Sequence, residues 1–198
     1  MTYSISKRIF WPIFRLFIKD IKGIENLPKK TCMIVSNHQS YIDAAIILLM
    51  FAWHRNTKIY IFATRQKFMN PIWQLIFWHF GAIRLGGAIS KGLQKLKEGH
   101  SILIFPEGQR TFDGKIQTVN HFGLGVLALN AKVPILPIGL RTFDFWNRYN
   151  KLPNWKKNIR IIIGKQITTE LTPTSTNYKK ITNTAMNEVA RLARISNS

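Results

Sequence analysis

The chain alternates short apolar runs with longer amphipathic stretches along most of its length. Several short runs are almost wholly apolar and end at a polar, Gly or Pro position, which is typical of strands buried on both faces of a sheet. The predicted strands occupy residues 31–36, 58–63, 82–85, 101–105, 133–140 and 160–163. The predicted helices between and after them occupy residues 43–53, 71–80, 90–97, 121–131 and 175–195. This alternation predicts a single α/β domain with a largely parallel central sheet flanked by helices.

A mixed apolar and cationic stretch, residues 5–19, precedes the first predicted strand. Pro12 would start or kink a helix there. The apolar residues that share one helical face are Ile5, Ile9, Ile13, Leu16 and Phe17. Such a face suits an interfacial helix on a membrane or an ordinary helix packed on the core, and we expect the interfacial helix. We therefore expect an amphipathic, membrane-surface segment over residues 1–22 and one folded domain over residues 23–198.

Composition adds a strong bias of charge. The chain has 29 Lys and Arg against 9 Asp and Glu, a formal net charge of +20. Such a charge calls for a polyanionic partner, either nucleic acid or an anionic lipid surface. Six Trp and thirteen Phe favour the lipid surface, because interfacial segments combine aromatic with cationic residues. We expect no nucleic acid partner, although a generally basic proteome is another explanation of the charge.

The cysteine count and the hydropathy argue against a disulfide-linked protein and against a protein that spans the membrane. The single cysteine, Cys32, excludes an internal disulfide and a cysteine-based metal cluster, and it is expected to be a buried thiol. The five His are not spaced as a ligand set, so we expect no metal. The longest uninterrupted apolar stretch, residues 44–53, is about half the roughly 18–20 residues that span a bilayer. We expect a peripheral or monotopic membrane protein at the cytoplasmic face.

The first chemical motif places an imidazole five residues before a carboxylate. Residues 37–43 read Asn-His-Gln-Ser-Tyr-Ile-Asp, so the pair is His38 and Asp43. On a continuous helix the two side chains would lie about 140° apart. If His38 instead lies in a turn and Asp43 begins the next helix, the Asp can orient the imidazole as a general base. The alternative, that both residues merely cap and pack the loop, is equally compatible with the spacing.

The second motif is a tight turn after an apolar run. Residues 105–115 read Phe-Pro-Glu-Gly-Gln-Arg-Thr-Phe-Asp-Gly-Lys. Gly108 permits backbone conformations closed to other residues. Glu107 and Arg110 therefore project from the carboxyl end of a strand, where open α/β sheets place their ligand crevices. The guanidinium can hold a phosphate bidentately; the alternative is a surface turn with an exposed ion pair.

Together the motifs resemble those of the glycerolipid acyltransferase superfamily, specifically the 1-acylglycerol-3-phosphate acyltransferases. The family's Asn-His-x-x-x-x-Asp signature is similar to residues 37–43, and its Phe-Pro-Glu-Gly-Thr-Arg-Ser block is similar to residues 105–111. Its Val-Pro-Ile-x-Pro-Val segment is similar to residues 133–138. The positions that support these motifs are Asn37, Ser40, Phe105, Pro106, Thr111, Pro134 and Pro137. Three blocks in the family's order make the resemblance specific.

The resemblance implies an acyltransferase that moves a fatty acyl group from acyl-CoA or acyl-ACP, as co-substrate, to the hydroxyl of a lysophospholipid. The expected acceptor is 1-acylglycerol-3-phosphate, giving phosphatidate, with no cofactor. His38 would deprotonate the acceptor and Asp43 would orient it. The expected acceptor-binding residues are Glu107, Gly108, Arg110 and Arg84. Pro134 and Pro137 would shape the wall of the acyl-donor region.

The chain departs from the family pattern at one basic position. The family's second block reads Gly-x-Ile-Phe-x-x-Arg, whereas residues 81–87 end in Gly87. Arg84 is a candidate substitute, but its odd offset on a strand would point it to the opposite face. The Phe-Lys-x-Gly element is also altered, at residues 119–123. Another lysophospholipid or glycerol-3-phosphate as acceptor stays open, as does a non-catalytic protein that binds membrane or nucleic acid.

Overall fold

The computed structural model describes residues 3–63, 81–84, 87–119, 121–156, 158–168 and 170–195. Of residues 3–6, 63, 84 and 195 only the backbone is described. The predicted helix at residues 71–80 lies outside the described residues.

The described elements follow the predicted order. The helices are α1 (Tyr3–Phe17), the 3-10 helix η1 (Ile24–Asn26), α2 (Asp43–Arg55), α4 (Ala88–Lys97), α5 (Gly123–Ala131), α6 (Phe143–Trp146) and α7 (Ser175–Ile195). The strands are β1 (Ile18–Lys22), β2 (Met33–Ser36), β3 (Ile59–Ala63), β4 (Ala82–Arg84), β5 (Ser101–Ile104), β6 (Ile135–Arg141) and β7 (Ile159–Ile163). The described ends of the predicted elements agree with the sequence prediction to within two residues.

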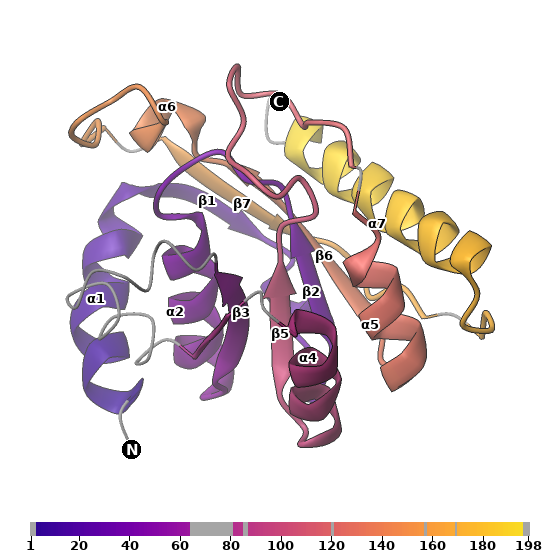
Figure 1. The fold of residues 1–198 in the computed structure, drawn as a ribbon. Coiled ribbons are helices and arrows are strands. Elements are labelled where there is room, and N and C mark those ends of the chain that lie inside the picture. Colours follow the sequence, from indigo (N-terminus) through magenta and orange to yellow (C-terminus); the bar gives the residue numbers. More distant parts are fainter. Residues whose placement is uncertain are drawn as a thin grey trace.

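The strands form one sheet in the order β1-β7-β6-β2-β5-β3-β4. Neighbouring strands pair in parallel except β6 and β7, which are antiparallel. In Figure 1, α1 and α2 lie on one side of the sheet, and α4, α5 and α7 lie on the other. The prediction of a largely parallel sheet flanked by helices is therefore confirmed.

Alternate residues of the central strands enter two separate cores. Ile34 packs in the core beneath α2, whereas Met33 and Val35 pack in the core beneath α5 and α7. This split follows from the two-residue period of a strand. All four residues of β2 are buried, so its unbroken apolar run has the pattern of a strand covered on both faces. Cys32, just before β2, is buried as expected, and burial raises the pKa of its thiol to about 12.

Strand β1 was not predicted from the sequence. It lies at the edge of the sheet and pairs in parallel with β7. Lys19, Asp20 and Lys22 break the apolar pattern that identifies a buried strand, and charged residues are common on edge strands. Helix α1 ends at Phe17, directly before this strand, so part of the N-terminal stretch belongs to the sheet.

Helix α1 turns most of its predicted apolar face away from the core. Ile9, Ile13 and Leu16 are exposed, Leu16 by 68%. Trp11 is buried instead, and its ring meets the ring of His54 on α2 edge to face. Phe17 belongs to the predicted face but contacts the ring of Phe145. The helix thus packs on the protein through one side and exposes an apolar strip on another.

Three adjacent strands end at one edge of the sheet. β6, β2 and β5 are neighbours and run parallel, so their carboxyl ends meet there. The segments that follow them begin at residues 142, 37 and 105. Both sequence motifs therefore come to the same edge, as Figure 1 shows for the loops above β2 and β5.

Two glycines of α5 provide a test of its packing on α7. A Cβ on Gly125 would lie 2.3 Å from the backbone oxygen of Tyr178, whereas a Cβ on Gly123 would be no nearer than 3.8 Å to any neighbour. Gly125→Ala should lower the free energy of unfolding by about 2 kcal/mol or more, because two backbones must separate. Gly123→Ala should leave it unchanged or raise it by up to about 1 kcal/mol. Urea denaturation measures both, and equal effects would contradict this packing.

Candidate active site

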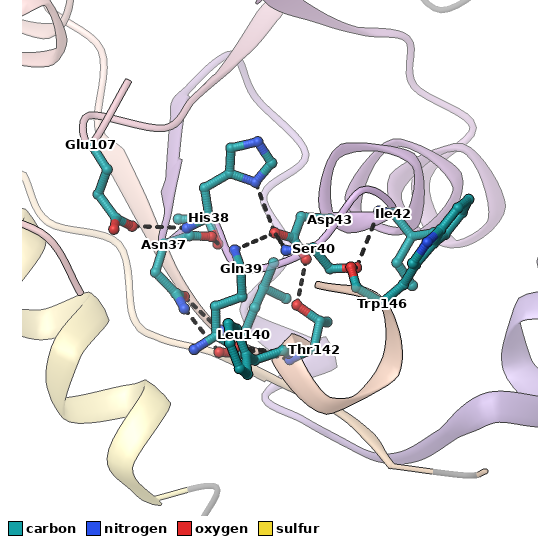
Figure 2. Close-up of polar contacts among 12 residues, drawn as sticks. Asn37, His38, Gln39, Ser40, Ile42, Asp43, Glu107, Leu140, Thr142 and Trp146 are labelled. Atoms are coloured by element: carbon teal, nitrogen blue, oxygen red, sulfur yellow. Dashed lines mark hydrogen bonds and ion pairs between the residues drawn. The ribbon is translucent and has the colours of Figure 1, made fainter. Parts of the chain in front are cut away.

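His38 and Asp43 meet at the turn that joins β2 to α2. His38 lies in the turn, and Asp43 is the first residue of α2. The imidazole Nδ1 is 2.8 Å from Oδ2 of Asp43. Because a carboxylate can only accept, we assign the proton to Nδ1, which leaves a lone pair on Nε2. Figure 2 shows the second ring nitrogen directed away from Asp43. The turn-and-helix geometry that we predicted for this pair is present.

The Asp43 carboxylate is fully buried and surrounded by donors. Oδ2 also accepts the backbone N–H groups of Gln39, at 2.6 Å, and Ser40, at 2.7 Å. Oδ1 accepts the hydroxyl of Thr142, at 2.5 Å. Burying a carboxylate is costly unless such donors compensate for lost water. These bonds fix the carboxylate, and through it the plane of the His38 ring.

Two amide side chains attach the turn to the end of β6. Asn37 donates from Nδ2 to the Leu140 oxygen at 2.9 Å and accepts the Leu140 N–H on Oδ1 at 2.8 Å. Gln39 accepts the Thr142 N–H on Oε1 at 2.9 Å and donates from Nε2 to the oxygen of Gly114 at 2.6 Å. The turn is therefore held from both sides, by the segment after β6 and by the loop after β5 (Figure 2).

Glu107 is a buried carboxylate bound by backbone donors. Its Oε1 accepts the His38 N–H at 2.8 Å, and its Oε2 accepts the Gln117 N–H at 2.9 Å. Burial raises the pKa of Glu107 to about 7, and the charge of Asp43 acts in the same direction. The two backbone bonds oppose this rise in the pKa. The interpretation of Glu107 as half of an exposed ion pair is thus wrong.

Arg110 is held on an aromatic ring. Its guanidinium carbon lies 3.4 Å from the centre of the Tyr41 ring, which in turn packs against the ring of Trp146 at 5.1 Å. One terminal nitrogen of Arg110 is buried and has no hydrogen-bond partner among the described residues. A buried guanidinium N–H without an acceptor is costly, so this group is suited to receive an acceptor from a ligand.

The start of the loop after β5 packs directly on the imidazole. The Phe105 ring stacks on the His38 ring, with centres 4.3 Å apart and planes 19° apart. The Thr111 N–H donates to the His38 backbone oxygen at 2.8 Å. Gly108 has φ of +71°, the left-handed conformation that favours glycine. The loop therefore fixes His38 from a second direction.

The other predicted site residues lie at different distances from this centre. Ser40 donates its hydroxyl to the Trp146 oxygen at 2.7 Å, and Pro106 is buried beside Glu107 in the chain. Pro134 precedes β6 and Pro137 lies within it, so both are on the amino side of the strand end that meets His38. Arg84 ends β4 opposite Ala63, and its side chain lies outside the described part of the chain.

Comparison with known proteins identifies the family of this chain. A family model described as Acyltransferase matches residues 19–141, which include both motifs and the β6 segment. This chain belongs to the Acyltransferase family.

Several relatives and one solved structure show how far the likeness to other members extends. The 1-acyl-sn-glycerol-3-phosphate acyltransferase of Pseudomonas aeruginosa is 29% identical over 73% of this chain and 57% of its own length. The probable enzyme of that name from Mycoplasma pneumoniae is 28% identical over 62% of this chain and 50% of its own. The chain therefore spans about half the length of these relatives.

The solved structure supports the fold. The crystal structure of the 1-acyl-sn-glycerophosphate acyltransferase PlsC from Thermotoga maritima superposes with a TM-score of 0.73 at 21% identity. The match covers 96% of this chain and 79% of that one. Because the identity is low, the likeness shows a shared fold and nothing further.

The sequence analysis missed several residues of the site in this family member. They are Gln39, Tyr41, Gln117, Thr142 and Trp146. Thr142 could have been found, because it follows a predicted strand at the edge where the motifs meet. The ring contacts of Tyr41 and Trp146 carried no signal, since they join residues more than 100 positions apart.

Glu107→Gln should remove a pH dependence of stability. The pKa of Glu107 in the folded protein, about 7, lies above its ordinary value of 4.5. Between these values the folded state holds more protons than the unfolded state, so stability falls as pH rises through this range. The wild-type minus variant difference in free energy of unfolding should fall by at most about 3 kcal/mol between them. Urea denaturation across this pH range measures the difference.

Glu98→Gln is the matched control for that measurement. Glu98 is exposed, and a hydrogen bond from Lys95 lowers its pKa. Its contribution to stability is therefore present above its ordinary pKa and lost as pH falls. The free energy of unfolding of the wild type minus that of Glu98→Gln should therefore not decline as pH rises. Parallel curves for the two variants would contradict the environment assigned to Glu107.

Proposed function

We propose that the protein transfers a fatty acyl group from an acyl thioester, acyl-CoA or acyl-ACP, to the free hydroxyl of a lysophospholipid. The proposed acceptor is 1-acylglycerol-3-phosphate, and the product is phosphatidate. The observation that carries this proposal is the buried His38–Asp43 contact, which leaves Nε2 directed away from its partner. The names of the relatives support the acceptor.

The proposed reaction uses His38 first as a base and then as an acid. Nε2 takes the proton of the acceptor hydroxyl while the hydroxyl oxygen bonds to the thioester carbonyl carbon. The tetrahedral intermediate then loses the thiolate as the C–S bond breaks, and the thiolate takes the proton from the imidazolium. The products are an ester and a free thiol. No acyl-enzyme forms, because the acceptor oxygen attacks the donor directly.

The surroundings of His38 suit this role. Asp43 fixes the tautomer in which Nε2 is the base and stabilises the imidazolium once the proton has moved. The Phe105 ring and the three other donors to Asp43 restrict rotation of both side chains. The pair is thus held in place before the substrates bind, which lowers the cost of reaching the transition state.

Arg110 is the proposed contact to the acceptor phosphate. It lies three residues after Glu107, whose carboxylate holds the His38 backbone. Its contact with Tyr41 uses the face of the guanidinium and leaves the in-plane N–H groups for a phosphate. Glu107 and Gly108 would complete the acceptor side, Glu107 through lone pairs that its two backbone bonds leave open.

We further propose that the protein acts at a membrane surface. In the described part of the chain, no helix combines the length and the hydropathy needed to cross a bilayer. The exposed strip on α1 supports attachment from one side instead, since Ile9, Ile13 and Leu16 face solvent beside cationic residues of the same helix. The net charge of +20 favours anionic lipid.

The double variant Ile13→Glu/Leu16→Glu should weaken binding to anionic phospholipid vesicles by at least about tenfold. Each substitution removes apolar area from the bilayer contact and adds a charge that anionic lipid repels. Vesicle co-sedimentation measures the effect. Ile89→Glu is the control, because Ile89 is exposed on α4, on the other side of the sheet. Equal binding by the double variant and the wild type would contradict attachment through α1.

His38→Ala tests the proposed chemistry. The purified protein would be incubated with acyl-CoA or acyl-ACP and a panel of lysolipids, and products identified by mass. Loss of the general base should lower kcat/KM about 10³-fold, while the protein still folds and still binds vesicles. His121→Ala, an exposed histidine, is the matched control. Full activity of His38→Ala would rule out the mechanism, and a wild type that acylates none of the lysolipids would rule out the function.

A further inference from the structure

A second arginine at this edge of the sheet is also held on an aromatic ring. The guanidinium carbon of Arg148 lies 3.7 Å from the centre of the Phe112 ring, much as Arg110 lies over Tyr41. Arg148 follows α6 in the chain and belongs to none of the sequence motifs. The side chains of Arg110 and Arg148 are both partly buried.

The two arginines are attached to the same turn. Arg110 and Phe112 flank Thr111, whose N–H donates to the His38 oxygen. Arg148 lies two residues after Trp146, whose oxygen accepts the Ser40 hydroxyl at 2.7 Å and the Tyr41 N–H at 3.3 Å. The arginine of one loop therefore stacks on the ring that the turn presents, and the arginine of the other loop stacks on Phe112.

An arginine that stacks on a ring keeps its N–H donors available, whereas an arginine that pairs with a carboxylate does not. Arg191, on α7, uses two nitrogens to contact Glu188, and the carboxylate balances its positive charge. A ring contact stabilises the cation but takes none of its in-plane N–H donors. Arg148 thus keeps its full charge and its fork of donors.

The acidic residues nearest to Arg148 and Phe112 in the chain have other partners. Asp113, beside Phe112, accepts the Thr111 hydroxyl at 3.1 Å and the Lys115 N–H at 3.0 Å. Asp144 is paired with Arg141 at 3.9 Å. No ion pair between an acidic residue and Arg148 occurs within the described ranges.

We propose that Arg148, which lies over the Phe112 ring, is a second arginine, besides Arg110, for the phosphate of the acceptor. This inference rests on the proposed function and adds a residue that recognises the proposed acceptor. Two guanidinium forks match a terminal phosphate monoester, which carries close to two negative charges at neutral pH. A phosphodiester head group carries one charge and has a substituent where the second fork would bind. Arg148 is therefore a specificity-determining residue for lysolipids that end in a phosphate monoester.

Arg148→Ala, Arg148→Lys and Arg191→Ala test this role. Steady-state rates would be measured with one acyl donor and two acceptors of equal chain length, lysophosphatidate and lysophosphatidylcholine. Arg148→Ala should raise the KM for lysophosphatidate about tenfold or more, the loss of one charge-assisted contact, with kcat and the donor KM unchanged. Its effect on lysophosphatidylcholine should be small. Arg148→Lys should restore part of the affinity, since it keeps the charge without the fork.

Arg191→Ala removes an equal charge from α7 and should leave every constant unchanged. The donor is the other possible source of phosphate, because coenzyme A carries several. A rise in the acyl-CoA KM of Arg148→Ala, with the acceptor KM unchanged, would overturn the assignment to the acceptor. An unchanged KM for both substrates would overturn the role altogether. Phe112→Leu should give a smaller rise in the lysophosphatidate KM than Arg148→Ala does.

A binding measurement separates this inference from the proposed function. Titration with sn-glycerol 3-phosphate, followed by NMR, should show weaker binding to Arg148→Ala than to the wild type, and glycerol should bind neither. If the wild type acylates no lysolipid but this difference is found, the function fails and the phosphate site stands. Equal binding by both proteins, together with an active wild type, removes Arg148 and leaves the function intact.

Discussion

The geometry of this edge of the sheet depends on one buried carboxylate. Asp43 has no exposed surface, and its two oxygens receive four donors from the turn, the imidazole and the segment after β6. Removing any of these donors would leave a charge in a medium of low dielectric, where it is poorly solvated. The Thr142 hydroxyl, which donates to Asp43, therefore links the end of β6 to the start of α2.

Glu107 extends this constraint to the third strand. It joins the His38 backbone to Gln117 across the loop after β5, so the turn that carries His38 is held between two loops. Asp43 and Glu107, two of the nine acidic residues, are therefore both buried and both bound to the turn at residues 38–40. The other seven acidic residues stand against 29 Lys and Arg, so the protein carries a large excess of positive charge.

Much of this arrangement was predictable, because the rules that govern it are local. Unbroken apolar runs identified the central strands, and parallel strands bring their carboxyl ends together, so both motifs had to meet. The contact between His38 and Asp43 was one of two interpretations that the spacing allowed, and it required His38 in a turn and Asp43 at a helix start. Strand β1 was missed because its charged residues hide an edge strand. The ring pairs of Arg110 and Arg148 were missed because they join distant loops.

The pattern of satisfied and unsatisfied groups indicates what the site lacks. Both buried carboxylates receive at least one hydrogen bond from the protein on each oxygen. Arg110 differs from these carboxylates, because one of its buried nitrogens has no hydrogen-bond acceptor within the described residues. Under the proposed function, the ligand has to bring hydrogen-bond acceptors and negative charge to the guanidinium groups, and a hydroxyl proton to Nε2 of His38. A lipid alcohol that carries a phosphate meets all three requirements, whereas a polyanion without a nearby hydroxyl meets only two.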